Sequence, residues 1–119
     1  MALEIYRPRM IYKRVEKDGE SVVEQYRVPY TTSEYDHEKE LLTLKMELPG
    51  VSKDEVKLDA TNKTLALKTT GDVSFFRSFK FNYYIKHKEI KAEMKDGILI
   101  LRIEKLVPEG EVPVEISVS

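Results

Sequence analysis

The sequence contains no cysteine and no tryptophan, and it has only five glycines and five prolines in 119 residues. Without cysteine there is no disulfide framework, no thiolate nucleophile and no thiolate ligand for zinc. No apolar run approaches the roughly 20 residues that a membrane-spanning helix requires. The first residues also lack the apolar segment of a signal peptide. We therefore expect a soluble, cytoplasmic protein without thiol chemistry.

An excess of charge of one sign is also missing. The chain has 20 basic and 21 acidic residues, for a net charge of -1 at pH 7. Proteins that bind nucleic acids or anionic membranes usually present a basic field. We therefore expect no nucleic acid and no membrane among the partners. The length fits a single domain, and an apolar content of 41% is enough for one core.

Groups suited to catalysis or metal binding are sparse. His37 and His87 are the only histidines, and both lie in charged, loop-like contexts that favour ordinary solvated side chains. Asp36, Glu38 and Glu40 could suggest a cation site, but they lack the glycine and distal glutamate of a calcium-binding loop. The glycines are never clustered as they are in phosphate-binding loops. We expect no enzyme, no catalytic residue, no metal ligand and no cofactor.

Apolar residues recur with a period of two along most of the chain, which is typical of half-buried β-strands. The clearest strands are expected over residues 42–48, 56–60, 64–68, 75–81, 90–94 and 98–101. Asp96-Gly97 is a strong signal for a two-residue hairpin. Residues 98–101 are apolar on both faces, as in a strand that is buried on both sides. Short strands separated by turn residues predict an all-β fold, specifically a β-sandwich.

The two ends of the chain differ from this central region. Residues 10–16 and 21–28 flank Lys17-Asp18-Gly19-Glu20, so the arm over residues 1–28 could hold a β-hairpin. The sandwich is expected over residues 29–105, followed by a hinge and tail over 106–119. The tail alternates again from Pro113 to Val118. An isolated strand is not stable alone, so the tail should dock on a sheet edge of its own domain or of a neighbour.

Four phenylalanines crowd residues 75–81 beside Arg77 and Lys80. Aromatic and basic side chains together can stack the bases of single-stranded nucleic acids. Three of the four phenylalanines share one parity, however, and such a face is more often part of a core.

Four segments together resemble the α-crystallin domain of small heat shock proteins. Glu47-Leu48-Pro49-Gly50-Val51, followed by Asp54-Glu55-Val56, resembles the opening of the domain's conserved part, and residues 92–99 resemble its A-x-x-x-(D/N)-G-(V/I)-L hairpin. Ile116-Ser117-Val118, with Pro113 ahead of it, is similar to the C-terminal I-x-I/V motif. Residues 76–79 resemble the F-x-R-x-F strand, which puts Arg77 at the interface arginine of the family. The resemblance extends from about Val28 to the C-terminus.

This resemblance implies an immunoglobulin-like β-sandwich of seven or eight strands and a stress-response chaperone. Such a chaperone is a holdase that captures unfolding client proteins without ATP. The resemblance also implies a homo-dimer or a higher homo-oligomer, in which the tail of one subunit enters a groove on its neighbour. The tail residues would be Val114, Ile116 and Val118. The groove residues would be Val56, Leu58, Ala60, Ile90, Ala92 and Met94.

One departure from the family pattern concerns the loop that non-metazoan members exchange between subunits. Only residues 70–74 are present where that long loop would be, and five residues span at most about 17 Å. We therefore expect a protein of the archaeal or bacterial type with a shortened swap loop. A CS-type co-chaperone domain, which shares the sandwich and docks on a dedicated partner, is the alternative that lacks such a loop. That fold does not need a tail motif.

Overall fold

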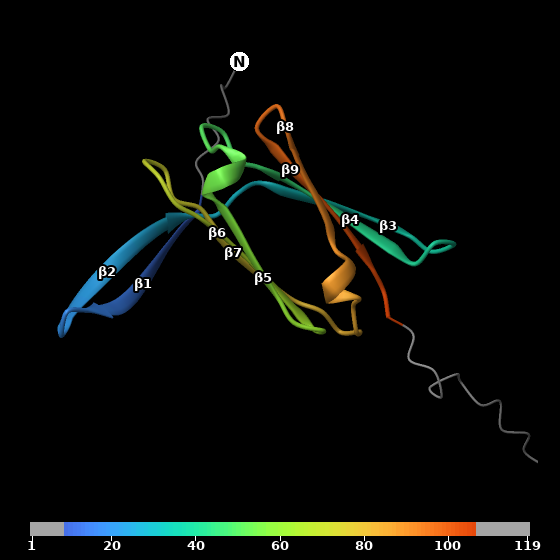
Figure 1. Ribbon diagram of the computed structural model, residues 1–119, viewed down its shortest axis with the longest axis horizontal. Coiled ribbons are helices and arrows are strands. Elements are labelled where there is room, and N and C mark those ends of the chain that lie inside the picture. The colour runs from blue at the N-terminus through green and yellow to red at the C-terminus, as the bar shows by residue number, and fades with distance from the viewer. Residues whose placement is uncertain (1–8, 107–119) are drawn as a thin grey trace, which may run out of the picture.

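The computed structural model describes residues 9–106, which form nine β-strands and two single-turn 3₁₀-helices (Figure 1). The elements in chain order are β1 (Met10–Lys17), β2 (Glu20–Arg27), β3 (Thr31–Asp36), β4 (Leu41–Glu47), η1 (Lys53–Glu55), β5 (Val56–Ala60), β6 (Thr64–Thr69), β7 (Phe76–Lys80), η2 (His87–Glu89), β8 (Lys91–Lys95) and β9 (Ile98–Glu104). None of the helices in residues 9–106 has the length and apolar character needed to span a bilayer.

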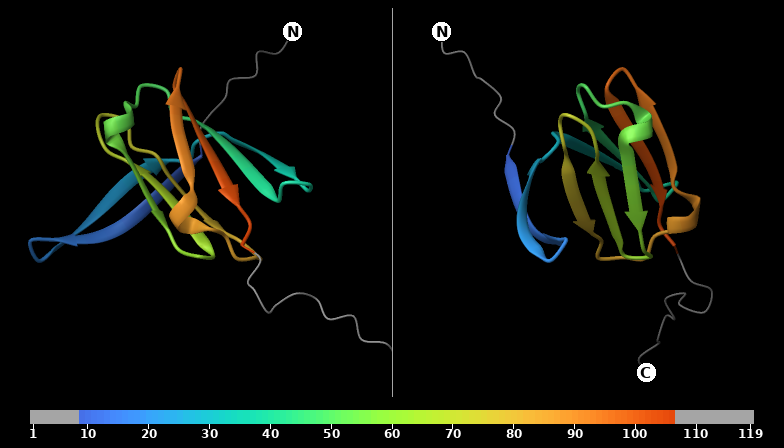
Figure 2. Two further views of the ribbon diagram at one scale, coloured as in Figure 1. Left: turned by 45° about the vertical axis from the view of Figure 1, so that its right-hand side comes forward. Right: turned by 60° about the vertical axis from the view of Figure 1, so that its left-hand side comes forward.

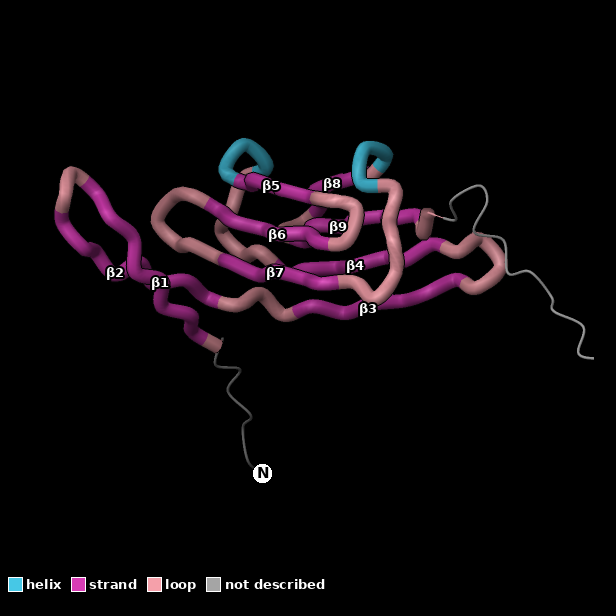
Figure 3. Tube along the Cα trace, turned by 90° about the horizontal axis from the view of Figure 1, so that it is seen from below, coloured by secondary structure: helices cyan, strands magenta, loops and turns pink. Residues whose placement is uncertain are grey.

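Strands β3 to β9 form two stacked antiparallel sheets (Figure 3). One sheet has four strands in the order β3-β4-β9-β8, and the other has three in the order β5-β6-β7. The predicted fold class is therefore confirmed: the described chain is an all-β, immunoglobulin-like sandwich. Strands β5 and β8 lie at edges on the same side of the sandwich, which positions the groove described below.

The core follows from the period-two pattern. Each central strand turns alternate apolar side chains toward the opposite sheet, where they are withdrawn from water. The buried side chains are Leu44, Met46, Leu48, Val51, Leu65, Leu67, Phe75, Ile85, Leu99, Leu101 and Ile103. Full burial stabilises each of them by about 1.5–3 kcal/mol relative to exposure. One continuous core therefore joins both sheets.

The prediction that residues 98–101 are buried on both faces is wrong. Leu99 and Leu101 are buried, whereas Ile98 and Ile100 on the other face are only half-buried. Strand β9 is central within its sheet, but only one face of that sheet is covered by the second sheet. Ile100 instead lies beside Lys45 and Glu93 of the neighbouring strands.

Two tight hairpin turns set the strand registers. Asp96 and Gly97 have φ angles of 51° and 75°, and Asp18 and Gly19 have φ angles of 52° and 78°. Positive φ at both central positions is what a type I′ turn requires, and it matches the right-handed twist of the flanking strands. The Asp96-Gly97 turn places Lys95 opposite Ile98 and so fixes the register of β8 on β9.

Strands β1 and β2 form a separate two-stranded sheet that projects from the sandwich (Figures 1 and 2). The base of this hairpin is attached to the start of β7. The Arg27 N–H donates to the Ser74 carbonyl at 2.8 Å, and Arg27 forms a parallel bridge with Phe75. Tyr26 is only 4% exposed. The hairpin is therefore anchored at its base, whereas its far end extends into solvent.

Strands β6 and β7 are joined by residues 70–75 and pair directly with each other. Thr69 closes this connection, because its hydroxyl accepts from the Phe75 N–H at 2.8 Å and it is only 1% exposed. The connection thus folds back on its own sheet.

Candidate functional site: a groove between two sheet edges

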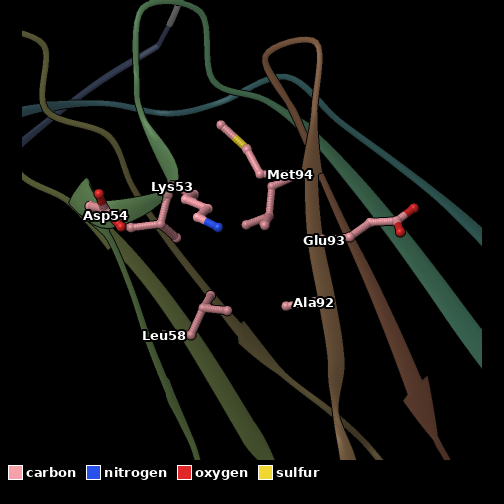
Figure 4. Close-up of a pocket in the computed structure, with 8 residues that line it drawn as sticks. Lys53, Asp54, Leu58, Ala92, Glu93 and Met94 are labelled. Atoms are coloured by element: carbon pink, nitrogen blue, oxygen red, sulfur yellow. The ribbon is translucent and has the colours of Figure 1, made fainter.

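A groove of about 580 Å³ opens between β5, at the edge of the three-stranded sheet, and β8, at the edge of the four-stranded sheet (Figure 4). Its lining residues come from η1, β5, β8 and β9. They are Lys53, Asp54, Val56, Leu58, Ala92, Glu93, Met94 and Leu99. The groove exists because the two sheets meet here through edge strands, so no further strand covers the side chains between them.

The floor of the groove is apolar. Leu58 of β5 and Ala92 of β8 face each other across it, while the carboxylate of Glu93 points to the other side of β8 (Figure 4). Met94 is half-buried and Leu99 is 3% exposed at the bottom. Because side chains alternate along β5 and β8, apolar groups from both strands line the groove. The backbone edges of these two strands border it on either side. Such a site can receive apolar side chains from alternate positions of an extended segment.

The upper rim of the groove is the helical turn η1. The backbone N–H of Ser52 donates to Oε1 of Glu55 at 3.0 Å, and the Ser52 hydroxyl lies 3.0 Å from the same oxygen. This capping box closes the turn. The N–H of Thr70 donates to the Glu55 carbonyl at 2.9 Å, which ties η1 to the end of β6. Gly71 has a φ of 112°, and a side chain there would collide with the Glu55 carboxylate. Lys53 and Asp54 are thereby held at the rim.

The structure brings together four of the six predicted groove residues, namely Val56, Leu58, Ala92 and Met94. Ala60 and Ile90 pack against the core and do not line the groove. Ile90 precedes β8 and follows η2, so it lies outside the strand that forms the wall. The role of all six as a tail acceptor stays a prediction.

Four lining residues were not predicted from the sequence, namely Lys53, Asp54, Glu93 and Leu99. Leu99 had a usable signal, because it shares parity with Leu101 in the apolar run and should face the same side. Lys53 and Asp54 lie at the rim because of where η1 is placed relative to β8, and the local sequence pattern does not show that placement.

Arg77 lies on β7, opposite Leu67 of β6. It is half-buried, and its Nη1 donates to the Pro29 carbonyl at 3.4 Å. Its guanidinium carbon lies 5.0 Å from the ring centroid of Phe79. A second cavity, of about 490 Å³, adjoins Arg77 and Pro29 where the hairpin meets the sandwich. These contacts are internal to the chain, and the predicted role of Arg77 at an interface stays a prediction.

The two histidines are separated by the fold. His37 is exposed after β3, with its ring 4.9 Å from that of Tyr35, and His87 lies in η2. Within residues 9–106, no three histidine, aspartate or glutamate side chains are grouped in a way that could hold a metal ion. The predicted tail residues Val114, Ile116 and Val118 lie outside the described residues.

Comparison with known proteins gives a consistent picture. The model of the Hsp20/alpha crystallin family matches residues 34–119. A protein of Pisum sativum named "Small heat shock protein, chloroplastic" is 26% identical over 95 residues, which covers 68% of this chain. A protein of Oxybasis rubra with the same name is 29% identical over 82 residues, or 60% of this chain. The chain spans 40% of the length of each of these two relatives.

Solved structures of other proteins share the fold. Heat shock protein 16.0 of Schizosaccharomyces pombe is 18% identical, with a TM-score of 0.61 over 79% of this chain and 77% of that one. A small heat-shock protein of Xylella fastidiosa is 19% identical, with a TM-score of 0.60 over 77% of this chain and 96% of that one. At these identities the likeness concerns the fold alone.

Proposed function

The chain belongs to the Hsp20/alpha crystallin family, and from that premise we propose that it is an ATP-independent holdase. In this proposal it binds partly unfolded proteins and prevents their aggregation. The observation that carries the proposal is the open apolar groove between β5 and β8 in a chain of this family. The relatives that it matches are named as small heat shock proteins.

The geometry of the groove suits capture of an extended segment. A partly unfolded client exposes apolar side chains and unpaired backbone groups. A segment lying between β5 and β8 would place every second side chain against Leu58, Ala92 and Met94. Burial of each such side chain would contribute about 1.5–3 kcal/mol, and pairing with a strand edge would orient the segment.

The same groove is the proposed acceptor for the tail of another copy. Val114, Ile116 and Val118 share one parity, so an extended tail would turn all three toward the groove. This contact would link copies into a homo-dimer or a higher homo-oligomer. The Xylella fastidiosa protein is described as having a distinct high order structure. The alternative is that the tail folds back onto its own sandwich as an edge strand.

Other details of the proposal rest on the sequence. The cytoplasmic location stays a prediction, and the curated relatives are named as chloroplastic. The archaeal or bacterial type with a shortened swap loop also stays a prediction, because the related proteins include plant, fungal and bacterial members. The absence of nucleic acid and membrane partners is likewise part of the proposal.

A heat-aggregation assay tests the proposed holdase activity. An unrelated enzyme that aggregates on heating is warmed without nucleotide, and light scattering is followed with and without an equimolar amount of this protein. We expect strong suppression, with serum albumin at equal mass as the control for crowding. Equal scattering in the presence and absence of the protein would contradict the holdase.

The CS-type co-chaperone remains a second candidate because residues 70–75 join β6 directly to β7, without a long exchanged loop. A co-chaperone of that type would bind one ATP-dependent chaperone and leave client aggregation unchanged. Binding to such an ATPase, measured by calorimetry together with a negative aggregation assay, would favour it.

A further inference from the structure

The N-terminal hairpin is a two-stranded sheet without a third strand. Among residues 9–106, β1 pairs only with β2, and its outer edge carries no neighbouring strand. A two-stranded ribbon is at best marginally stable in water, and its unpaired backbone groups are a template for another strand. Figure 3 shows that the hairpin lies beside the sandwich and is not stacked within it.

The β1 edge is basic and partly apolar. Lys13, Arg14 and Lys17 outweigh the single carboxylate of Glu16, so β1 carries a net charge of +2. Tyr12 is 65% exposed on the face that points away from the sandwich. Arg14 makes no ion pair with any described residue. This edge thus holds a cation and an aromatic ring that the described chain does not use.

The β3 edge is its acidic counterpart. Strand β3 ends the four-stranded sheet and has one side free of any strand in the described range. Its charged residues are Glu34 and Asp36, which give a net charge of -2. Both side chains are exposed, and Glu34 makes no ion pair with a described residue.

The two edges cannot meet within one chain. Residues 28–30 alone join β2 to β3, and three residues span at most about 11 Å. The hairpin and β3 extend to opposite sides of this link (Figure 1). Pro29 within the link is fully buried, and its carbonyl accepts from the hydroxyl of Thr31 at 3.0 Å, so the direction of the hairpin is held. A β1 strand can therefore reach a β3 edge only in another copy.

We propose that β1 of one copy pairs antiparallel with β3 of a second copy of this chain. The four-stranded sheet would thereby gain the hairpin as two further strands. A register that sets Arg14 opposite Glu34 also sets Tyr12 opposite Asp36 on the solvent face. The same register sets Val15 opposite Ser33 on the core side of β3, where it gains cover from the partner. The contact is reciprocal under a two-fold axis, so both hairpins are used and no edge of this kind is left open.

This pairing differs from exchange of a loop between β6 and β7, because the exchanged element is the N-terminal hairpin. It is also independent of client capture. If the protein pairs in this way but does not suppress aggregation, the proposed holdase activity is contradicted and the proposed interface is not.

The absence of cysteine allows a direct test by crosslinking. Full-length Arg14→Cys and Glu34→Cys variants, carrying tags of different mass, are mixed and mildly oxidised. Non-reducing electrophoresis should show a mixed covalent dimer as the main product. The matched control pairs Arg14→Cys with Lys57→Cys, since Lys57 is exposed on β5, away from both edges. Equal yields of mixed dimer from the two pairs, or no mixed dimer, would overturn the proposal.

Charge reversal gives an independent readout. Arg14→Glu or Glu34→Arg alone should weaken self-association, measured by analytical ultracentrifugation, by about 10-fold, because like charges meet at both symmetric contacts. The two changes combined in one chain should restore most of the affinity. A third crosslinking arm uses Ser78→Cys, which is exposed on β7. Efficient Ser78→Cys homodimers, together with no effect of charge reversal, would place the interface at β7 and refute pairing through β1.

Discussion

The ammonium of Lys13 lies 3.3 Å from the ring centroid of Phe76, and this contact joins the N-terminal hairpin to the outer face of the three-stranded sheet. Tyr26 of the same hairpin approaches that ring with a centroid separation of 5.8 Å. A cation–π contact at a partly exposed site contributes about 0.5–1 kcal/mol. The hairpin is thus held by a few side chains near its base, and its docking should be separable from the stability of the sandwich.

Replacing Phe76 with alanine should release the hairpin. The ring is half-buried and contacts both Lys13 and Tyr26, so its loss should raise hydrogen exchange in residues 10–27 by about 10-fold, corresponding to about 1.4 kcal/mol. Amides of β4 and β9 should keep their protection. Uniformly faster exchange across both sheets would show that the hairpin and the sandwich unfold as one unit. Lys80→Ala, an exposed change on the same strand, is the matched control.

The hairpin itself should be less stable in acid. Glu24 accepts from the hydroxyl of Tyr26 and lies 3.0 Å from Nζ of Lys17, and these hydrogen bonds hold the pKa of Glu24 below its ordinary value of 4.5. Because the folded state lowers the pKa, the contribution is fully present above pH 4.5 and is lost as pH falls through the folded pKa. Hydrogen-exchange protection factors of the amides of residues 10–27, measured at pH 6 and at pH 3, should fall less for Glu24→Gln than for the parent. The same pH dependence in the parent and in Glu24→Gln would contradict a stabilising role for the Glu24 carboxylate.

Gly97→Val should destabilise the sandwich. Gly97 has a φ of 75°, and its carbonyl accepts from the Leu48 N–H at 2.7 Å. A β-branched residue is strained at this φ, so we expect a loss of about 1–3 kcal/mol in the free energy of unfolding. Urea denaturation would measure it, with Asp96→Asn as a control because asparagine tolerates positive φ. An unchanged urea midpoint would mean that a side chain at position 97 causes no strain in this turn.

Filling the groove should reduce assembly without unfolding the domain. Ala92 is exposed on the groove side of β8, so Ala92→Trp should occupy the space proposed for the tail of a neighbour. Light scattering after size exclusion should show a smaller species at an unchanged melting temperature. Lys91→Trp, on the opposite face of the same strand, should leave the size as it is.

The matching change on the tail is Ile116→Ala combined with Val118→Ala. We expect the same reduction in size, because both side chains are proposed to enter the groove. A lowered melting temperature with an unchanged size would indicate instead that the tail packs on its own domain.

Much of the fold could be predicted from the alternation of apolar and polar residues alone. Successive side chains of a strand point to opposite faces, so a strand with one buried face has an apolar residue at every second position. The strands around Leu44, Leu58 and Leu67 were identified in this way, and the Asp96-Gly97 turn followed from the need for positive φ. The prediction that both faces are buried was wrong for Ile98 and Ile100. The sequence pattern shows which residues are apolar, but it does not show whether a second layer covers them.

The groove could be predicted only through family resemblance. Strands β5 and β8 are separated in sequence by three other elements, and their approach depends on the order of strands in two sheets. Local pattern carries no information on that order. For the same reason the contact between Lys13 and Phe76 had no signal in the sequence.

The link between the hairpin and the sandwich contributes contacts that lie upstream of the region matched by the family model. The family match starts at residue 34, inside β3, so a chain shortened to that region would lose Thr31, whose place is opposite the fully buried Met46. It would also lose Pro29, the buried acceptor for Arg77, and Tyr26, the buried ring at the base of the hairpin. The family match and the contacts of the sandwich therefore begin at different residues in this chain, because Tyr26, Pro29 and Thr31 all contribute contacts upstream of residue 34.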